Sequence, residues 1–238
     1  MTKRVIIIGG KGNGGVAAAC IRDMNERFQL NDYQVYGFLN DFIPKGEKIN
    51  GYPVVGDLKD ITKYLKQDFL FLYAIHSVSH GALRMEIYKT LGIPDKKLAT
   101  VIHPNAFIGE GAVIEPGVLI MANTYVGTNS IIGKCTFLMA NSCVSHDSVV
   151  GAFCHISMGA ICGSHITIGA GCDVALNATL IENIQLGTCS VVGAGAMCLN
   201  DVEDFQVVVG NPAKHHKYLP ERESKSEWIK KHIKQNKK

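Results

Sequence analysis

The pattern of apolar and polar positions divides the chain into two parts. In the first hundred residues, short apolar runs alternate with segments whose apolar residues have helical spacing. The apolar runs lie at 4–10, 33–41, 69–75 and 98–102, and the helical segments at 15–28, 57–67 and 79–93. Asp57 is expected to cap the second helix. This alternation predicts an α/β domain over residues 1–100, with a small Rossmann-like parallel sheet and right-handed crossovers.

From Ile102 to Cys198 an aliphatic position recurs at every sixth residue, and the register never slips. Of these 17 positions, 15 hold Ile, Val or Leu and two hold Cys. A small residue stands two positions earlier in 13 of the 16 cases from Ile108 onward. A period of six fits neither a helix nor one long strand. It is typical of short strands joined by tight corners, which predicts a hexapeptide parallel β-helix over residues 101–214 with the aliphatic side chains inside.

Charge is scarce in this repeat region. Between Val118 and Asn200 the only charged residues are Lys134, Asp147, Asp173 and Glu182. Outer faces with so few charges favour burial against other subunits. The net charge of +3 arises from residues 217–238, which hold eight Lys or Arg and three Glu. We interpret residues 215–238 as a basic helical tail with a solvated face, and we expect no nucleic-acid binding.

The eight cysteines contain no C-x-x-C pair and no short metal-ligand spacing. Seven of them lie in the charge-poor region, where small apolar residues are needed. We therefore expect reduced core thiols, no metal site and a cytoplasmic location. No apolar stretch is long enough to span a bilayer, so membrane insertion is not expected.

The segment VIIIGGKGNGGV, residues 5–16, places a glycine turn between the first strand and the first helix. Backbone N–H groups at such a turn, together with the helix N-terminus, favour an anion. A lone glycine turn is weak evidence for a dinucleotide site, and we disfavour a Rossmann oxidoreductase. Tight packing of the strand on the helix is the alternative explanation of these glycines.

Two histidines lie in the middle of the repeat region. His146 follows the aliphatic Val144 by two residues, so we expect it on a flat face with its side chain pointing outward. Imidazole titrates near neutral pH, which suits a general base. Asp147 is adjacent, but the sequence leaves open whether its carboxylate meets the ring. His155 follows Val150 by five residues and is expected near a corner of the prism.

Four segments together resemble one family: the glycine turn, VIHPNAFIG (101–109), SHDSVVGAFCHISMGA (145–160) and VVVGNPAK (207–214). They are similar to the left-handed β-helix, hexapeptide-repeat sugar O- and N-acetyltransferases. These include sialic acid O-acetyltransferases and UDP-4-amino-sugar N-acetyltransferases. The resemblance covers nearly all of residues 3–218. It implies a left-handed β-helix, a homotrimer, and acetyl-CoA as co-substrate in the cleft between adjacent prisms.

The resemblance also implies roles for individual residues. His146 of the His-Asp motif is expected to be the general base, with Asp147 as its carboxylate partner. Acetyl-CoA contacts are expected at His155, Leu176 and Ala194. Nucleotide-sugar contacts are expected at Lys11, Gly12, Asn13, Asn40 and Asp41. Many relatives have S-G-H-G in the turn where this chain has K-G-N-G, which leaves the identity of the sugar nucleotide open.

The leading hypothesis is acetyl-CoA-dependent N-acetylation of a nucleotide-linked amino sugar, by direct attack on the thioester. O-acetylation of a sugar such as sialic acid is the alternative, because nothing in the sequence separates an amine from a hydroxyl acceptor. A non-catalytic β-helix binding protein is the third hypothesis, and the presence of His146 argues against it.

Overall fold

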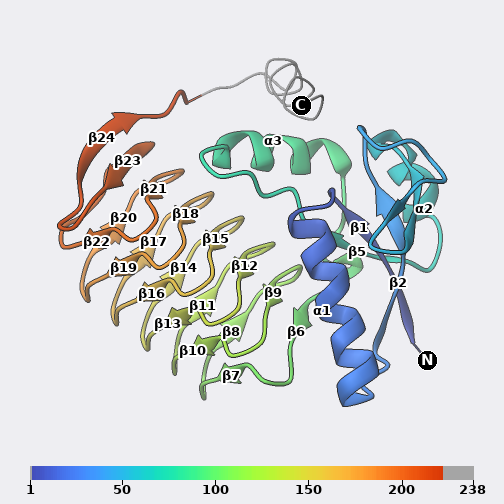
Figure 1. Cartoon of the computed structure of the whole chain (residues 1–238), viewed down its shortest axis with the longest axis horizontal. Helices are drawn as coiled ribbons and strands as arrows, with labels where there is room; N and C mark the ends of the chain where they lie inside the picture. Colours follow the sequence, from blue (N-terminus) through green and yellow to red (C-terminus); the bar gives the residue numbers. More distant parts are fainter. Residues whose placement is uncertain (1, 222–238) are drawn as a thin grey trace.

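The computed structural model describes residues 2–221. An N-terminal α/β domain packs beside a long β-helix (Figure 1). The domain has a five-stranded sheet of order β3-β4-β2-β1-β5. Its strands are β1 (Lys3–Ile8), β2 (Tyr33–Leu39), β3 (Lys48–Ile49), β4 (Tyr52–Gly56) and β5 (Leu70–Tyr73). Its helices are α1 (Asn13–Phe28), α2 (Ile61–Leu65), α3 (Gly81–Leu91) and the short 3-10 turns η1 (Leu58–Asp60) and η2 (Asp95–Lys97).

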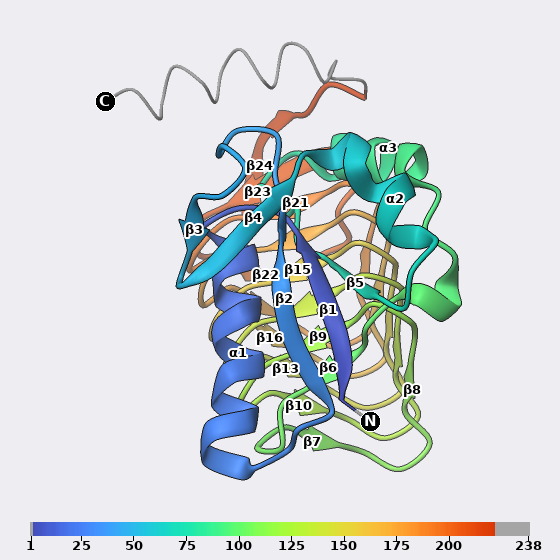
Figure 2. The same cartoon turned by 90° about the vertical axis from the view of Figure 1, so that its right-hand side faces the viewer.

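Helix α1 covers one face of this sheet, and α2 and α3 lie on the other (Figure 2). β1 is parallel to both β2 and β5, as the crossover pattern predicts. The core under α1 includes Leu119 and Phe137 of the β-helix, and the core under α3 includes Cys135. The two parts of the chain therefore share their hydrophobic cores.

Three local predictions for this domain need correction. Residues 98–102 do not form a full fourth strand of the sheet: Leu98 makes a single parallel bridge to Phe71 of β5, whereas Val101 and Ile102 form β6, which pairs with β9 of the β-helix. The edge strand β3 and its neighbour β4 were not expected. The segment 57–67 forms η1 followed by a short α2, although Asp57 does cap it by accepting hydrogen bonds from Lys59 N and Asp60 N.

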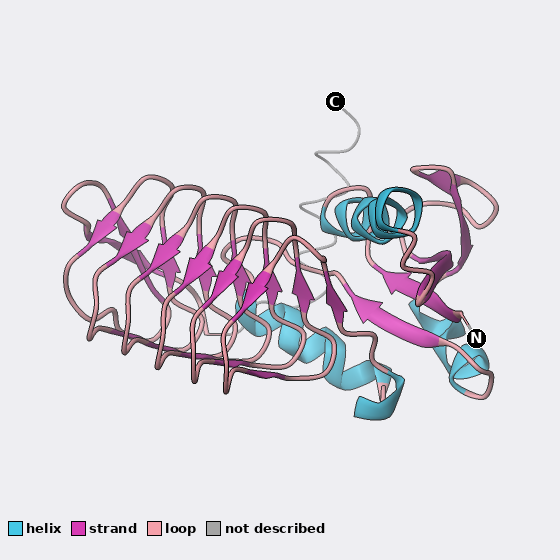
Figure 3. Cartoon of the chain, turned by 90° about the horizontal axis from the view of Figure 1, so that it is seen from below, coloured by secondary structure: helices cyan, strands magenta, loops and turns pink. Residues whose placement is uncertain are grey.

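The β-helix is a left-handed three-sided prism built from two-residue strands (Figure 3). One face packs on the N-terminal domain, and we call it the covered face. Its strands are β6 (Val101–Ile102), β9 (Leu119–Ile120), β12 (Phe137–Leu138), β15 (His155–Ile156), β18 (Asp173–Val174) and β21 (Val191–Val192). The other two faces carry no part of the described chain, and we call them the open faces.

The first open face follows the covered face in the chain, and the second comes next. The first consists of β7 (Phe107–Ile108), β10 (Tyr125–Val126), β13 (Cys143–Val144), β16 (Ile161–Cys162), β19 (Thr179–Leu180) and β22 (Met197–Cys198). The second consists of β8 (Val113–Ile114), β11 (Ile131–Ile132), β14 (Val149–Val150), β17 (Thr167–Ile168) and β20 (Gln185–Leu186). The aliphatic repeat is confirmed, because its positions from Ile120 to Cys198 are at most 2% exposed.

The corners between faces depend on two kinds of residue. From Gly111 to Gly195, one residue in each corner has a positive φ, for example Asn129 at 57° and Asp147 at 54°. Gly, Asn and Asp accept this conformation most easily. Small residues stand two positions before most aliphatics, and several of their hydroxyls bond to the next coil, as Ser130 Oγ does to Ser145 O at 2.8 Å. The sixfold spacing of small residues is therefore a corner requirement.

The prism ends in an antiparallel pair, β23 (Gln206–Val209) and β24 (Lys214–Tyr218). The expected helical tail is thus wrong for residues 215–218, which form a strand. The part of that prediction from residue 222 onward lies outside the described residues. Within residues 2–221 no helix is both long and apolar enough to cross a bilayer.

Candidate active site

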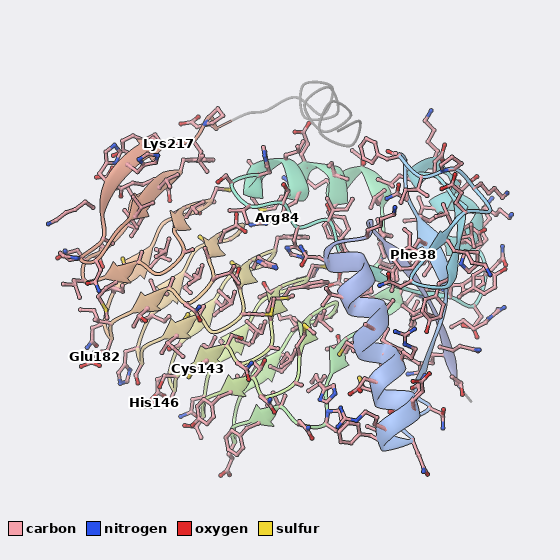
Figure 4. All side chains as sticks on the ribbon, viewed as in Figure 1. Phe38, Arg84, Cys143, His146, Glu182 and Lys217 are labelled. Atoms are coloured by element: carbon pink, nitrogen blue, oxygen red, sulfur yellow. The ribbon has the colours of Figure 1, made fainter. Side chains whose placement is uncertain are left out.

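His146 and Asp147 lie in the corner between β13 and β14, where the two open faces meet. The side chain of His146 is 48% exposed and points away from the prism (Figure 4). The outward direction was expected, but the flat face was wrong. The positive φ of Asp147 turns the chain back, so that His146 Nδ1 and Asp147 Oδ2 are 2.7 Å apart. The question that the sequence left open is answered: the carboxylate does meet the ring.

The corner holds a continuous hydrogen-bond chain. Asn129 Nδ2 donates to Asp147 Oδ1 at 3.1 Å, from the coil before. Ser164, one coil after His146, places its Oγ 3.0 Å from His146 Nε2. Ser145 Oγ is in turn 3.0 Å from Ser164 Oγ. The bonds from His146, and then from Asn129, hold the pKa of Asp147 below its ordinary value.

The exposed carboxylate fixes the tautomer of the ring. Asp147 is ionised at neutral pH and can only accept, so a neutral His146 donates from Nδ1 and accepts at Nε2. An imidazole with its free lone pair at Nε2 is the form that removes a proton from an incoming nucleophile. The corner therefore presents an oriented general base to solvent.

His165 adds a second imidazole to this corner, with its ring centroid 5.2 Å from that of His146 and perpendicular to it. Ligand atoms of His146, Asp147 and His165 lie within 4.8 Å of one another, the one such group found within residues 2–221. Both nitrogens of His146 already have partners in Asp147 and Ser164. The arrangement thus suits proton transfer better than metal binding.

His155 is in a different environment. It lies on strand β15 of the covered face, so the expected corner position is wrong. It is 8% exposed, and burial lowers its pKa to about 4. Its Nε2 lies 3.3 Å from Asn13 Oδ1, and its Nδ1 lies 3.1 Å from Ser157 Oγ. Both ring nitrogens are used within the chain, so its expected contact with acetyl-CoA stays a prediction.

A cluster of rings surrounds His155 where the two parts of the chain meet. His76 follows β5 and packs on Phe137, with ring centroids 4.4 Å apart, and lies 5.5 Å from His155. Burial holds the pKa of His76 well below its ordinary value. Asn13 joins the cluster by donating from Nδ2 to His76 O at 2.8 Å. The side chain of Asn13 thus links the glycine turn to the β-helix.

A buried ion pair also joins the N-terminal domain to the β-helix at this boundary. Arg84 of α3 donates to Asp173 Oδ1 at 2.9 Å, and both side chains are 1% exposed. The same guanidinium bonds Gly171 O at 2.6 Å, and Ser79 N donates to Asp173 Oδ2 at 2.8 Å. Asp173 is one of the four charges in the charge-poor region, and this pair explains its presence.

The glycine turn borders a cavity of about 200 Å³ in the N-terminal domain. Among the expected nucleotide contacts, Gly12, Asn13, Asn40 and Asp41 line it, whereas Lys11 is exposed beside it. Asn40 shapes the wall: its Nδ2 donates to Gly9 O, and its Oδ1 accepts from the backbone of the following loop. Asp41 Oδ1 accepts from Leu58 N at 2.8 Å. The cavity is therefore held open by the side chains that were expected to bind the nucleotide.

The candidate residues do not converge on one place within a single chain. Leu176 and Ala194 are exposed one coil apart, on the edge between the covered face and the first open face. His146 lies on the far edge of that open face, across the prism from the N-terminal domain (Figure 4). A ligand in the cavity of one chain therefore lies on the other side of the prism from His146 of the same chain.

Two families match consecutive segments of the chain. The "PglD N-terminal domain" matches residues 4–91, and "Bacterial transferase hexapeptide (six repeats)" matches residues 99–134. The chain thus joins a segment similar to the PglD N-terminal domain to a hexapeptide-repeat segment.

Particular relatives extend this likeness. UDP-N-acetylbacillosamine N-acetyltransferase of Bacillus subtilis (strain 168) is 32% identical over 122 residues, which are 50% of this chain and 52% of the relative. The chain therefore spans about half the length of the curated relative that it matches.

Solved structures match over most of the chain. PerB from Caulobacter crescentus, in complex with CoA and GDP-perosamine, has 25% identity and a TM-score of 0.76, and the match covers 91% of this chain and 99% of that one. The acetyltransferase domain of PglB from Neisseria gonorrhoeae, in complex with acetyl coenzyme A, has 28% identity and a TM-score of 0.76. That match covers 91% of this chain and 100% of the other. The predicted left-handed β-helix and the family resemblance are confirmed.

The sequence reasoning missed Ser164 and His76. The signal for Ser164 was present, because it follows His146 by 18 residues, one full coil of three hexads. His76 carried no such signal, because its neighbours Phe137 and His155 are remote in the chain and obey a different period.

Proposed function

We propose that this protein is an acetyl-CoA-dependent N-acetyltransferase that acts on a nucleotide-linked amino sugar. The observation that carries the proposal is the oriented base at the corner, where Asp147 holds His146 through Nδ1, and where Nε2, beside the Ser164 hydroxyl, is the accepting nitrogen. The cavity at the glycine turn, the bacillosamine enzyme and the GDP-perosamine complex support a nucleotide-sugar acceptor. The complexes with CoA or acetyl-CoA support the donor.

In this proposal the sugar amine attacks the thioester carbonyl directly. A C–N bond forms, the C–S bond breaks, and the amine proton passes to His146 Nε2 before it reaches the departing CoA thiolate. Asp147 keeps the ring in the required tautomer and stabilises the imidazolium that forms. No acyl-enzyme is needed because a thioester is already activated.

The separation of the cavity from His146 requires a second chain. The acceptor would bind in the N-terminal domain of one protomer and meet His146 of a neighbour in a homotrimer, with acetyl-CoA in the cleft between the prisms. The apolar residues of the open faces support such packing, for example Phe107, Tyr125 and Ile161 at 55%, 41% and 41% exposure. All eight cysteines are free thiols, which supports a reducing, cytoplasmic location.

A thiol-release assay tests the activity. Acetyl-CoA is supplied with UDP-, dTDP- and GDP-linked amino sugars, and with free sialic acid as the hydroxyl-bearing alternative. His146→Ala is expected to lower kcat by about 10²–10⁴, the range for loss of a general base. Thr128→Ala is the matched control, since Thr128 occupies the same corner one coil earlier and is exposed. Efficient acetylation of sialic acid with no turnover of any amino sugar would replace this proposal with O-acetylation.

A further inference from the structure

We propose that the Ser164 hydroxyl is a catalytic proton relay between the reacting amine and His146. The inference rests on the proposed function. It starts from the partners of the His146 ring. Nδ1 is occupied by Asp147, which Asn129 holds in place, so this nitrogen cannot receive the proton of the acceptor. Nε2 is the remaining site, and Ser164 Oγ lies 3.0 Å from it.

The direction of each hydrogen bond follows from the donors available. Because Nδ1 carries the ring proton, Nε2 accepts, and the single hydroxyl hydrogen of Ser164 points to it. Ser164 Oγ must then accept from Ser145 Oγ, 3.0 Å away. An sp³ hydroxyl oxygen has two lone pairs, and the bond from Ser145 uses only one. The second lone pair is left for a donor from outside, and Ser164 is only half-buried.

An incoming amine can use that lone pair without disturbing the chain. As the amine nitrogen bonds to the thioester carbon, its proton moves to Ser164 Oγ while the Ser164 proton moves to His146 Nε2. One N–H and one O–H bond break, and one O–H and one N–H bond form. The return path delivers the proton from the imidazolium through Ser164 to the CoA thiolate, and Ser164 is never acylated.

The competing arrangement is displacement, in which the amine takes the place of Ser164 at Nε2. The two arrangements predict opposite effects of removing the hydroxyl. Under displacement Ser164 competes with the acceptor, so Ser164→Ala is as fast as wild type or faster. Under the relay the same variant loses a link in the proton path and becomes slower.

The experiment compares kcat and KM of wild type, Ser164→Ala and Ser164→Thr on an accepted amino-sugar substrate, with Thr128→Ala as control. The relay predicts that Ser164→Ala lowers kcat to about one tenth of the wild-type value or below and leaves the KM for each substrate almost unchanged. Ser164→Thr should recover the wild-type kcat. Comparing the kcat of Ser164→Thr with that of Ser164→Val repeats the test with two side chains of equal size, one with a hydroxyl and one without. This pair guards against a disturbance of the corner by alanine. An alanine variant at or above wild-type kcat overturns the relay, as does a threonine variant as slow as valine.

A second measurement separates the relay from the proposed function. Nitrogen NMR of the wild-type protein without ligands should find His146 protonated at Nδ1 with Nε2 accepting, and a changed Nε2 signal in Ser164→Ala. A ring protonated at Nε2 overturns the relay whatever the enzyme acetylates. If wild type acetylates none of the acceptors but the NMR result is as expected, the proposed function is contradicted. The hydrogen-bond chain from Asp147 through His146 to Ser164 is then still supported.

Discussion

The covered face and the first open face of the prism have the same repeat but different surroundings. On both, the second residue of each strand points inward, and the first points outward. The outward residues of the covered face, from Val101 to Val191, are all buried, and they include the charged Asp173 and the polar His155. On the first open face, Phe107, Tyr125 and Ile161 are exposed, whereas Cys143, Thr179 and Met197 are half-buried. Phe107 stacks on Tyr125 with 5.0 Å between ring centroids.

This contrast separates what the repeat determines from what its surroundings determine. The hexad fixes the inward side chains, because a wide or polar residue there would disrupt the coil. The outward side chains depend on what covers them. On the covered face that is the N-terminal domain of the same chain, whose Arg84 and Asn13 supply partners for Asp173 and His155. The open faces carry equally apolar residues without a described partner, which is why we assign them to neighbouring chains.

The largest expected effect comes from placing a charge on an open face. Ile161→Lys should prevent assembly, so that sedimentation finds monomers where we expect a trimer for wild type, and acetyl transfer should fall to background. The reason is that burying an unpaired ammonium in an apolar contact is costly. Leu30→Lys, an exposed apolar position after α1, is the control and should stay trimeric. A trimeric, active Ile161→Lys protein would show that this face is not an interface.

Breaking the ion pair behind the covered face should have the next largest effect. Arg84→Met leaves the Asp173 carboxylate buried without its partner, which typically costs about 3–5 kcal/mol of unfolding free energy. Denaturant unfolding measures this loss. The double variant Arg84→Met with Asp173→Leu should recover much of it, because no buried charge remains. A single variant as stable as wild type would mean that water reaches the pair.

Acid should destabilise the covered face through His155. Its pKa is about 4 when folded and close to the ordinary 6.5 when unfolded, so the unfolded chain binds more protons between these values. Stability is therefore full above pH 6.5 and falls by about 3 kcal/mol as the pH drops to 4. His155→Gln should flatten this part of the profile, whereas His165→Gln on the exposed corner should not. An unchanged profile in His155→Gln would contradict the assignment.

The smallest effect concerns the glycine turn. Lys11→Met should weaken binding of a nucleoside diphosphate by about 1–3 kcal/mol, the scale of a hydrogen bond to a charged group. Calorimetric titration with UDP, dTDP and GDP measures this. Lys89→Met, an exposed lysine at the end of α3, is the matched control. Equal affinities in the two variants would remove Lys11 from the nucleotide site.

The sequence alone predicted most of the fold, because the hexad is a local signal repeated along the chain. It placed the inward residues from Ile120 to Cys198 correctly and located the helices α1 and α3 to within a few residues. It failed where an element depends on distant partners. Strands β3 and β4 are short and lack a period. Residues 101–102 look like one more strand of the α/β sheet until their pairing with β9 is known.

The candidate site was predicted residue by residue, but not in space. The motif identified His146 and Asp147, yet their contact depends on the positive φ of Asp147, which the sequence pattern did not reveal. His155 was placed near a corner because its distance was counted from Val150, whereas it directly precedes the inward Ile156 on a strand. Its burial follows from the N-terminal domain that covers this face, which no count along the β-helix can indicate.

The central claim is that the nucleotide cavity of one chain works with His146 of a neighbour. Complementation between two inactive variants tests it most directly. His146→Ala lacks the base. Gly12→Trp should block the cavity, since Gly12 lines it and an added Cβ there meets nothing within 4 Å. Mixed trimers of the two variants, formed by co-expression with different tags, contain sites that pair an intact cavity with an intact His146. In a cyclic trimer with random mixing these are about a quarter of all sites. We predict recovery of roughly that fraction of wild-type kcat, whereas trimers as inactive as either parent would contradict a site shared between chains.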